Sequence, residues 1–307
     1  MWKRMLFFGL VCALAADEAR ADTNNLVVGA RAQGMGSAYS AVGDDASATF
    51  WNPAAMTRMP RTEFTYSHWM LSDVDNIGVD FAAVAVPLAA GNLEAAVGFS
   101  FTRVGAQLEE GPSGATSDIS DSRFALSGGL RLHRALSVGL SLNRLEVNSE
   151  RESGAGFGFD AGLLVEPLED YDLRLAVVGR NLSADVKNED LDQSWRMGGA
   201  WTFWQRRITV AGESGLRQNI NGSDGTTGLF FGGLEIAPVE QFAVRGGGGS
   251  ESQWGVGFGV QHRGFAFDYA FSDDDQVLGT SHRFSVSLAF GAGPLGGTQD
   301  NAPSGGP

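Results

Sequence analysis

Bulky apolar residues recur at every second position in many short runs between residues 61 and 290. In one run Phe157, Phe159 and Leu163 alternate with glycine and aspartate, and similar runs occupy 254–260 and 284–290. Side chains along a β-strand point alternately to opposite faces, so each run has one apolar face and one face of polar or small residues. The repetition predicts a sheet closed into a barrel, with the apolar face toward lipid.

Fourteen strands fit the sequence. We place them at 61–71, 76–86, 93–103, 122–132, 136–147, 155–166, 173–183, 194–204, 206–216, 226–236, 240–248, 252–262, 264–272 and 280–290. A strand of about 11 residues is roughly 36 Å long, and a tilt of about 40° reduces its rise to about 28 Å, which suits a hydrocarbon core. The expected fold class is all-β, a 14-stranded antiparallel transmembrane β-barrel over residues 61–290.

The connections between these strands alternate in length. We number the connections from the one that follows the first predicted strand. The even-numbered connections are short, such as 87–92 and 133–135, whereas most odd-numbered connections are longer and acidic or glycine-rich, such as 104–121 and 184–193. Outer-membrane barrels have short turns on the periplasmic rim and longer loops on the outer rim. We therefore expect the protein to lie in the outer membrane of a Gram-negative bacterium. Both mature termini should be periplasmic, and the acidic loops should lie outside the cell.

The first 21 residues have the features of a secretory signal peptide. Lys3 and Arg4 precede an apolar core at 5–16, and Ala19-Arg20-Ala21 is a small-x-small cleavage site. This core is too short to span a bilayer, which disfavours the alternative of an uncleaved anchor. Cys12 lies within the signal and is the one cysteine of the sequence, so disulfides do not stabilise the mature chain.

Charge and hydropathy exclude other classes. The formal net charge of −14 argues against nucleic acid as a partner. No stretch of 18 apolar residues follows the signal, which excludes helical membrane spans. A soluble β-sandwich or β-propeller is the alternative fold. A sandwich would bury its apolar face against a second sheet, and no propeller repeat of about 40–50 residues is found.

Eleven charged residues within the predicted strands share the parity of the polar face, which assigns them to the lumen. An arginine on the lipid face at mid-depth costs about 2–4 kcal/mol, so several of them there would exceed typical folding stability. We expect a network of ion pairs across the lumen, formed by Glu94, Arg123, Arg131, Asp160, Arg174, Arg180, Arg196, Glu213, Arg245, Asp268 and Arg283. The side chains of fourteen strands do not fill such a lumen, which is therefore plugged or conducting.

Aromatic residues cluster near the predicted strand ends, where interfacial girdles place amphipathic side chains. The expected girdle comprises Tyr66, Trp69, Trp195, Trp204, Trp254, Phe265 and Phe290. Ordinary β-propensity explains part of this enrichment.

Residues 22–60 lack the two-residue alternation and are rich in alanine and glycine. Asp44-Asp45 is a candidate N-cap for a helix at 46–51, and Asn52-Pro53 reads as a cap and first-turn proline for a helix at 54–59. Small, mildly apolar helices suit the inside of a barrel. We therefore expect residues 22–60 to form a hatch in the lumen, and a flexible Gly/Pro-rich tail to occupy 291–307.

The hatch contains motifs that resemble those of a known family. Gly34-Met35-Gly36-Ser37-Ala38-Tyr39, Asp44-Asp45-Ala46 and Asn52-Pro53-Ala54 resemble the N-terminal hatch of the outer-membrane long-chain fatty-acid transporter (FadL/TodX-type) superfamily. The string from Gly29 to Met56 is similar to that of its smaller PorV/PorQ-like branch, which includes accessory barrels of the type IX secretion system.

The resemblance implies a hatch that blocks the lumen and helps to bind or pass a hydrophobic molecule. Its motif residues are Gly34, Gly36, Tyr39, Asp44, Asp45, Asn52, Pro53 and Ala54. The chain departs from the larger transporters because it lacks the long extracellular insertions that form their substrate-capturing groove.

No pattern predicts catalysis, a metal or a cofactor. His68 and His282 are expected to be neighbours on the outward face, since the first and last strands pair in a closed barrel. The adjacent Ser67 and Ser281 face the other way, so they do not form a nucleophile–histidine pair with these residues. No histidine, cysteine and carboxylate spacing suggests a zinc or other transition-metal site. The run Asp273-Asp274-Asp275 lacks the spaced ligands of a calcium loop.

The sequence thus predicts a non-enzymatic barrel that binds or passes hydrophobic small molecules, such as lipids or fatty-acid-like compounds, past a lumenal hatch. Its expected partners are outer-membrane lipid and a hydrophobic small-molecule ligand. The alternative is a non-transporting barrel that docks periplasmic or secretion-machine proteins, as a component of a secretion or surface-motility machine.

Overall fold

The computed structural model describes residues 26–71, 77–110, 115–148, 153–168, 171–186, 189–219, 225–250, 253–274, 279–291 and 293. The expected signal at 1–21 and nearly all of the tail at 291–307 lie outside these residues.

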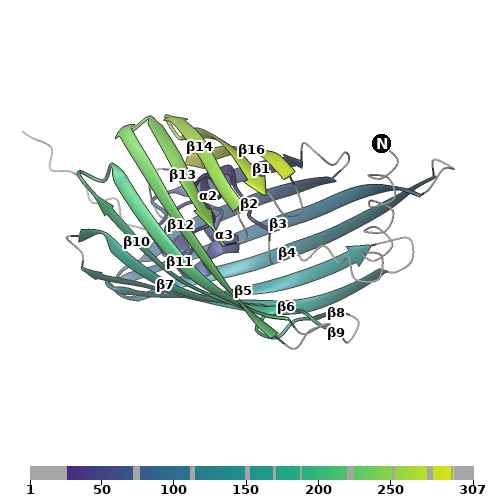
Figure 1. Cartoon of the computed structure of the whole chain (residues 1–307). Helices are drawn as coiled ribbons and strands as arrows, with labels where there is room; N and C mark the ends of the chain where they lie inside the picture. Colours follow the sequence, from purple (N-terminus) through teal and green to yellow (C-terminus); the bar gives the residue numbers. More distant parts are fainter. Residues whose placement is uncertain are drawn as a thin grey trace, which may run out of the picture.

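Fourteen antiparallel strands form one closed ring (Figure 1). Each strand pairs with its neighbours along the chain, and β1 pairs with β16 to close the ring, with Tyr66 opposite Val286. The strands are β1 (Thr62–Leu71), β2 (Ile77–Ala90), β3 (Leu93–Glu110), β4 (Ala115–His133), β5 (Leu136–Asn148), β6 (Ser153–Leu168), β7 (Leu173–Arg180), β10 (Gln193–Phe203), β11 (Ile208–Asn219), β12 (Gly225–Val239), β13 (Phe242–Gly249), β14 (Gln253–His262), β15 (Phe265–Asp274) and β16 (Gly279–Phe290).

The expected fold class is confirmed, with differences at several strand ends. The predicted loop at 104–121 is largely strand, because β3 and β4 stay paired as far as Glu110 and Ala115. The predicted turn at 87–92 is shorter, since β2 continues through Pro87 to Ala90. Pairing with β1 ends at Ala85, so β2 has a single neighbour at Pro87 and the missing N–H disrupts no second ladder.

The connection from β7 to β10 carries a further small hairpin. It consists of β8 (Asp185–Val186) and β9 (Glu189–Asp190), and β8 pairs with β6 beside Gly156 and Phe157. The predicted loop at 184–193 is therefore partly ordered against the wall.

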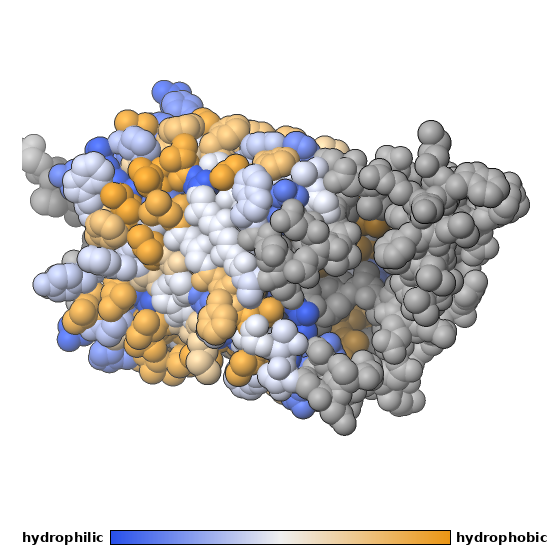
Figure 2. All heavy atoms as spheres, in the orientation of Figure 1, coloured by the Kyte–Doolittle hydropathy of each residue, from blue (hydrophilic) through white to orange (hydrophobic). Residues whose placement is uncertain are grey.

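The outer face of the ring is apolar, and burial alternates along the strands as predicted. Leu140, Leu142 and Phe230 leave 64%, 57% and 66% of their surfaces exposed. Figure 2 shows apolar side chains spread over the described part of the visible wall. A band of this kind on all sides of a closed sheet is what a barrel presents to hydrocarbon.

Six of the seven expected girdle residues are exposed, and five of them lie near strand ends, whereas Tyr66 lies in the middle of β1. The expectation for Trp69 is wrong. Trp69 is only 8% exposed and packs with Val79 and Val104 on the inner face. Position 69 has the inward parity of Thr65 and Ser67, which are also buried, so aromatic character alone misassigned it.

The hatch lies inside the ring, where Figure 1 shows α2 and α3 enclosed by the strands. It contains α2 (Ala30–Gly34), α3 (Ala48–Trp51) and the 3₁₀ helix η1 (Pro53–Arg58). The main apolar core is formed largely by hatch side chains, including Met35, Tyr39 and Trp51, against inward wall residues such as Phe81 and Leu164. Among the described residues, no helix is long and apolar enough to cross a membrane.

The exposed band predicts how charge is tolerated along one pair of neighbouring strands. Leu142→Arg, in the middle of β5, should destabilise the barrel in lipid vesicles by about 2–4 kcal/mol, because a cation would be forced into hydrocarbon. Leu132→Arg, near the short-turn end of β4, should cost about 0–1 kcal/mol. Urea unfolding in vesicles measures both, and equal costs would contradict a membrane band centred on Leu142.

Candidate functional site

The Asn52-Pro53-Ala54 motif begins η1 and fixes the hatch to the wall. Asn52 Oδ1 accepts from the backbone N–H of Ala54 at 3.0 Å, and Pro53 occupies the first turn, so the predicted cap and proline are confirmed. The Asn52 amide also donates to the carbonyls of Ser40 at 3.0 Å and Leu163 at 3.3 Å. One fully buried side chain therefore joins two hatch segments to β6.

The prediction for Asp44-Asp45 is partly wrong. The helix begins at Ala48 rather than 46, and its N-cap residue is Ser47. Asp45 instead accepts from the N–H of Ser47 at 2.9 Å, in a turn preceding the helix, and Asp44 pairs with Arg31. The Arg31 guanidinium binds the Asp44 carboxylate, which the local sequence assigns to helix capping.

Inward glycines of the wall receive the Asn52-Pro53-Ala54 segment, by its backbone at β5 and by its side chains at β6. A Cβ atom at Gly139 of β5 would lie 2.3 Å from the Ala54 nitrogen and 2.4 Å from the Pro53 carbonyl carbon. One at Gly162 of β6 would lie 2.1 Å from Asn52 Oδ1. These separations are far below van der Waals contact, so no larger residue fits while the hatch is docked.

The Gly34-Met35-Gly36 motif makes the same kind of contact with β12 and β13. Gly36 has a positive φ of 58°. A Cβ atom at Gly247 would lie 2.5 Å from the Met35 carbonyl carbon, and one at Gly233 would lie 2.3 Å from the Met35 oxygen. Both hatch motifs are therefore docking surfaces, each matched to glycines on a different part of the wall.

Arg31 connects the hatch to a strand of the wall. Its guanidinium lies 2.6 Å from Asp44 and 3.4 Å from Asp45, both in the hatch, and 3.0 Å from Glu235 of β12. Tyr39 donates to Asp45 at 2.5 Å, which leaves this carboxylate shared between a hydroxyl and the cation.

The electrostatics of this cluster stabilise ionised Asp44. Burial alone would raise the pKa of the Asp44 carboxyl, but the neighbouring guanidiniums, Arg31 foremost, hold it well below its ordinary value. Burial raises the pKa of the Tyr39 hydroxyl well above its ordinary value, so this group stays a neutral hydrogen-bond donor.

Wall charges continue the network around the lumen. Arg245 lies 2.6 Å from both Glu235 and Asp268. Arg196 lies 2.6 Å from Glu213, which accepts from the backbone N–H of Ser40 at 2.9 Å. The wall thus satisfies hatch backbone groups as well as its own charges.

A second cluster contains the most buried arginines. Arg123 pairs with Asp160 and donates to Asn143 at 3.1 Å. The Arg180 guanidinium donates to the carbonyl of Phe50 at 3.1 Å and lies 4.5 Å from the centre of its ring. Cation–π and hydrogen-bond contacts with α3 therefore hold Arg180 in a position where it is only 1% exposed.

The structure places the eleven sequence-predicted lumen residues as follows. Six are at most 5% exposed, namely Arg123, Asp160, Arg174, Arg180, Glu213 and Arg283. Arg131, Arg196, Arg245 and Asp268 are half-buried. Glu94 is exposed at the short-turn rim, where it lies 2.8 Å from Arg131. The eleven are not one cluster, since separate groups contact different parts of the hatch.

Sequence reasoning missed the residues that connect hatch and wall, namely Arg31, Arg58, Glu166, Asp172 and Glu235. Parity could have found Glu235, because it lies within a predicted strand at an inward position between Gly233 and Ala237. No sequence signal marks Arg31 or Arg58 as partners of residues more than 100 positions away.

The loop-side part of the lumen wall contains two apolar clusters. One cluster contains Trp69, Val79 and Val104, with Leu26 and Ile77 packed against it. A second contains Leu145 and Ala184, with Val147 and Leu191. The Arg283 guanidinium lies 4.1 Å from the centre of the Trp69 ring, and no ion pair of Arg283 is found among the described residues.

The histidines lie outside this lumen. His68 Nδ1 is 2.8 Å from Asp80 Oδ1, which also accepts from Tyr66 at 2.6 Å. His282 Nδ1 lies 2.7 Å from the Tyr269 hydroxyl. Ser67 and Ser281 are buried on the opposite face, so neither serine lies beside the imidazoles as a nucleophile would.

No group of three or more potential metal ligands is found in the described part of the chain. The acidic run at 273–275 falls partly outside that part, because Asp275 is not described.

Solved structures share this fold. The CymD monoaromatic hydrocarbon channel aligns with a TM-score of 0.67 at 15% identity, over 87% of this chain and 98% of that chain. The Pseudomonas putida toluene transporter TodX aligns at 0.63 and 12%, over 85% and 96%. A Pseudomonas aeruginosa FadL homologue aligns at 0.57 and 12%, over 86% and 98%.

This chain has the fold of these three proteins. No protein-family model and no curated protein matches the sequence. At these identities the similarity concerns the fold alone.

The glycine contacts predict a difference between two wall positions. Gly139→Ala should weaken hatch docking by about 1–3 kcal/mol, because the new methyl group would overlap the Pro53-Ala54 backbone. Gly128→Ala is the matched control on the neighbouring strand, since nothing lies within 4 Å of its Cβ position. Thermal unfolding with limited proteolysis measures both, and equal stabilities would show that the hatch does not press on the wall there.

The Asp44 cluster predicts a pH dependence. A carboxyl with a lowered folded-state pKa contributes stability that is present above its unfolded pKa of about 4 and is lost as pH falls toward the folded value. Hatch docking should therefore weaken below about pH 4, and Asp44→Asn should flatten this response. Pepsin cleavage of the hatch as a function of pH measures it, with exposed Glu240→Gln as control. An unchanged profile in Asp44→Asn would contradict the assignment.

Proposed function

We propose that this protein is an outer-membrane barrel that binds hydrophobic small molecules and passes them through a lumen guarded by the hatch. The observation that carries the proposal is the division of the lumen. The wall around the hatch is charged and glycine-rich, whereas the loop-side wall has two buried apolar clusters, at Trp69-Val79-Val104 and at Leu145-Ala184. An apolar lining with few polar groups is typical of sites for small hydrophobic ligands.

The comparison of folds supports the same substrate class. Two similar structures are named a monoaromatic hydrocarbon channel and a toluene transporter. Since fold alone does not establish function, the proposal for this chain depends on the apolar clusters above its own hatch.

The proposed orientation follows from the two rims. The short turns, the end of η1 and the last strand residue Phe290 lie on one rim, and the longer connections lie on the other. We place the short-turn rim, and with it both mature termini, in the periplasm, as in other outer-membrane barrels. The motif residues from Gly29 to Met56 also support a place in the smaller PorV/PorQ-like branch.

We assign hatch residues a gating role. Gly34, Gly36, Asn52, Pro53 and Ala54 dock the hatch against the wall, and Tyr39, Asp44 and Asp45 fix its fold around Arg31. Passage of a ligand then requires these contacts to loosen on at least one side, since the hatch core is fully buried. No catalytic role is proposed for any residue.

Trp69→Ala tests the proposal. It should weaken binding of toluene or a fluorescent fatty acid to the detergent-purified protein by about tenfold, because it removes the largest apolar surface of the loop-side lumen. Met70→Ala is the matched control, since Met70 is the next residue and lies 45% exposed on the outer face. Isothermal calorimetry or fluorescence titration measures the affinities.

Two outcomes would reject the transport reading. One is a wild-type protein that binds neither probe and carries no co-purified hydrophobe. The other is equal loss in Trp69→Ala and Met70→Ala, which would place the ligand on the outer wall. A barrel without any ligand would favour the docking role in a secretion or motility machine.

A further inference from the structure

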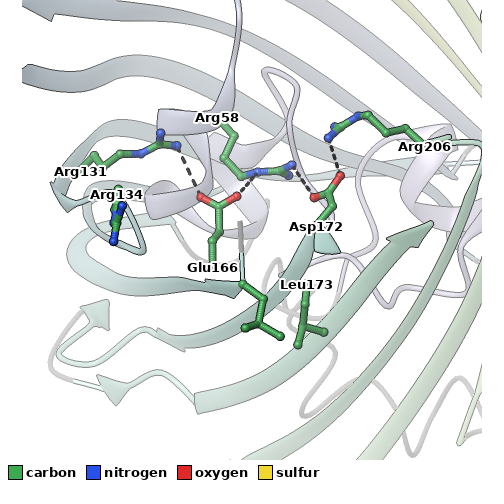
Figure 3. Close-up of a pocket in the computed structure, with 8 residues that line it drawn as sticks. Arg58, Arg131, Arg134, Glu166, Asp172, Leu173 and Arg206 are labelled. Carbon is green, nitrogen blue, oxygen red and sulfur yellow. Dashed lines mark hydrogen bonds and ion pairs between the residues drawn. The ribbon is translucent and has the colours of Figure 1, made fainter. Parts of the chain in front are cut away.

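A cavity of about 290 Å³ opens at the short-turn rim, where the end of the hatch meets the wall (Figure 3). Its walls are the β4–β5 turn, the end of β6 with the start of β7, and the β10–β11 turn, and Arg58 of the hatch completes it. The lining residues are Arg58, Arg131, Arg134, Glu166, Leu168, Asp172, Leu173 and Arg206. This cavity is separate from the apolar clusters of the proposed transport path.

The described lining carries more positive than negative charge. Four of its residues are arginines and two are carboxylates. In Figure 3 the charges alternate along one chain, in which Glu166 lies between Arg131 and Arg58, and Asp172 lies between Arg58 and Arg206. Such a local excess of cations is unexpected in a protein whose formal net charge is −14.

The ion pairs do not use all the donors. Arg58 lies 3.1 Å from Glu166 and 3.6 Å from Asp172. Arg131 lies 3.5 Å from Glu166 and 2.8 Å from Glu94, which is outside the lining. Yet Arg58 Nη1 and Arg131 Nε are buried without a hydrogen-bond acceptor among the described residues. The Arg58 side chain is only 9% exposed, so water does not readily satisfy it. A buried donor without a partner is costly, and an oxyanion with several acceptor oxygens would satisfy these groups.

The surroundings of the cavity are those of a membrane interface. Tyr171 and Trp204 belong to the two turns beside it and are 60% and 65% exposed. Exposed tyrosine and tryptophan at a barrel rim prefer the headgroup level of a bilayer. Leu168, 49% exposed, and Leu173 add an apolar edge to the arginine cluster. Phosphate headgroups occupy that level, and guanidinium groups bind phosphate by paired hydrogen bonds.

We propose that this cavity binds a phosphate group, carried either by the headgroup of an anionic glycerophospholipid or by a soluble phosphate ester. The apolar edge and the exposed aromatic residues favour the lipid. Because Arg58 is the last residue of η1, the bound group contacts the end of the hatch and fixes it to the rim. Only the lipid source depends on the proposed membrane placement.

The test uses the full chain in detergent and native mass spectrometry with added phosphatidylglycerol. Arg206→Gln and Arg134→Gln should each bind this lipid about tenfold more weakly than the wild type, since each removes a cation from the lining. Arg207→Gln is the matched control, because Arg207 lies in the same turn but outside the lining and donates to the carbonyl of Pro238. Heat-dependent gel migration checks that each variant is folded.

Two further arms identify the source of the phosphate. Diacylglycerol with the same acyl chains should bind no better than background, since it lacks the phosphate. Competition by inorganic phosphate at equal concentration indicates a soluble ester, and its absence indicates the lipid.

The proposal is overturned if phosphatidylglycerol and diacylglycerol bind equally. It is also overturned if Arg206→Gln and Arg207→Gln lose the same affinity. Neither result bears on hydrophobic ligands at Trp69, so a failure here is distinct from a failure of the transport function.

Discussion

A ring of fourteen strands encloses more space than its own inward side chains can fill, and the rest of the structure depends on how that space is occupied. The hatch supplies the missing volume with small helices and the turns between them, and its apolar side chains include Met35, Tyr39 and Trp51. Because the space is nearly closed to water, every inward charge needs a partner. The arginines of the wall therefore pair with carboxylates of the wall or donate to carbonyls of the hatch. The lumen is in effect the core of this protein, and the apolar band lies outside.

Two kinds of contact hold the hatch in the lumen, namely charged contacts and close packing against wall glycines. The charges around Arg31 and Arg180 set its orientation, since Arg31 pairs with carboxylates of both hatch and wall, and Arg180 of the wall donates to the Phe50 carbonyl of α3. The wall glycines set its distance, because backbone meets backbone where Pro53 passes Gly139 and where Met35 passes Gly247. Electrostatic contacts of this kind depend on pH, whereas steric fit does not. Acidic pH should therefore loosen the hatch by weakening its ion pairs. Replacement of a wall glycine by a larger residue should loosen it by steric overlap, independently of pH.

Much of the fold could be predicted because a strand reports its orientation locally. Alternation over a few residues separates lipid-facing Phe157 from inward Asp160 without knowledge of any other strand. How far a strand extends beyond the membrane cannot be predicted in this local way. Strands β3 and β4 continue to Glu110 and Ala115 only because they pair with each other. Residue type alone placed Trp69 wrongly in the outer girdle. Its position in the alternation of the strand puts its side chain on the inner face, although tryptophan is typical of girdles. Asp44 shows the limit of local capping rules, because Arg31 recruited its carboxylate.

The glycine contacts have a consequence for how such barrels can diverge or be recombined. Gly139, Gly233 and Gly247 each leave room for one particular stretch of hatch backbone, and Gly162 leaves room for the Asn52 side chain. A hatch grafted from another barrel, with its bends one residue out of step, would place Cβ atoms and carbonyls where these recesses are absent. The unit that can be exchanged is therefore the hatch together with its recesses on β5, β6, β12 and β13, even though more than 70 positions of sequence separate the two.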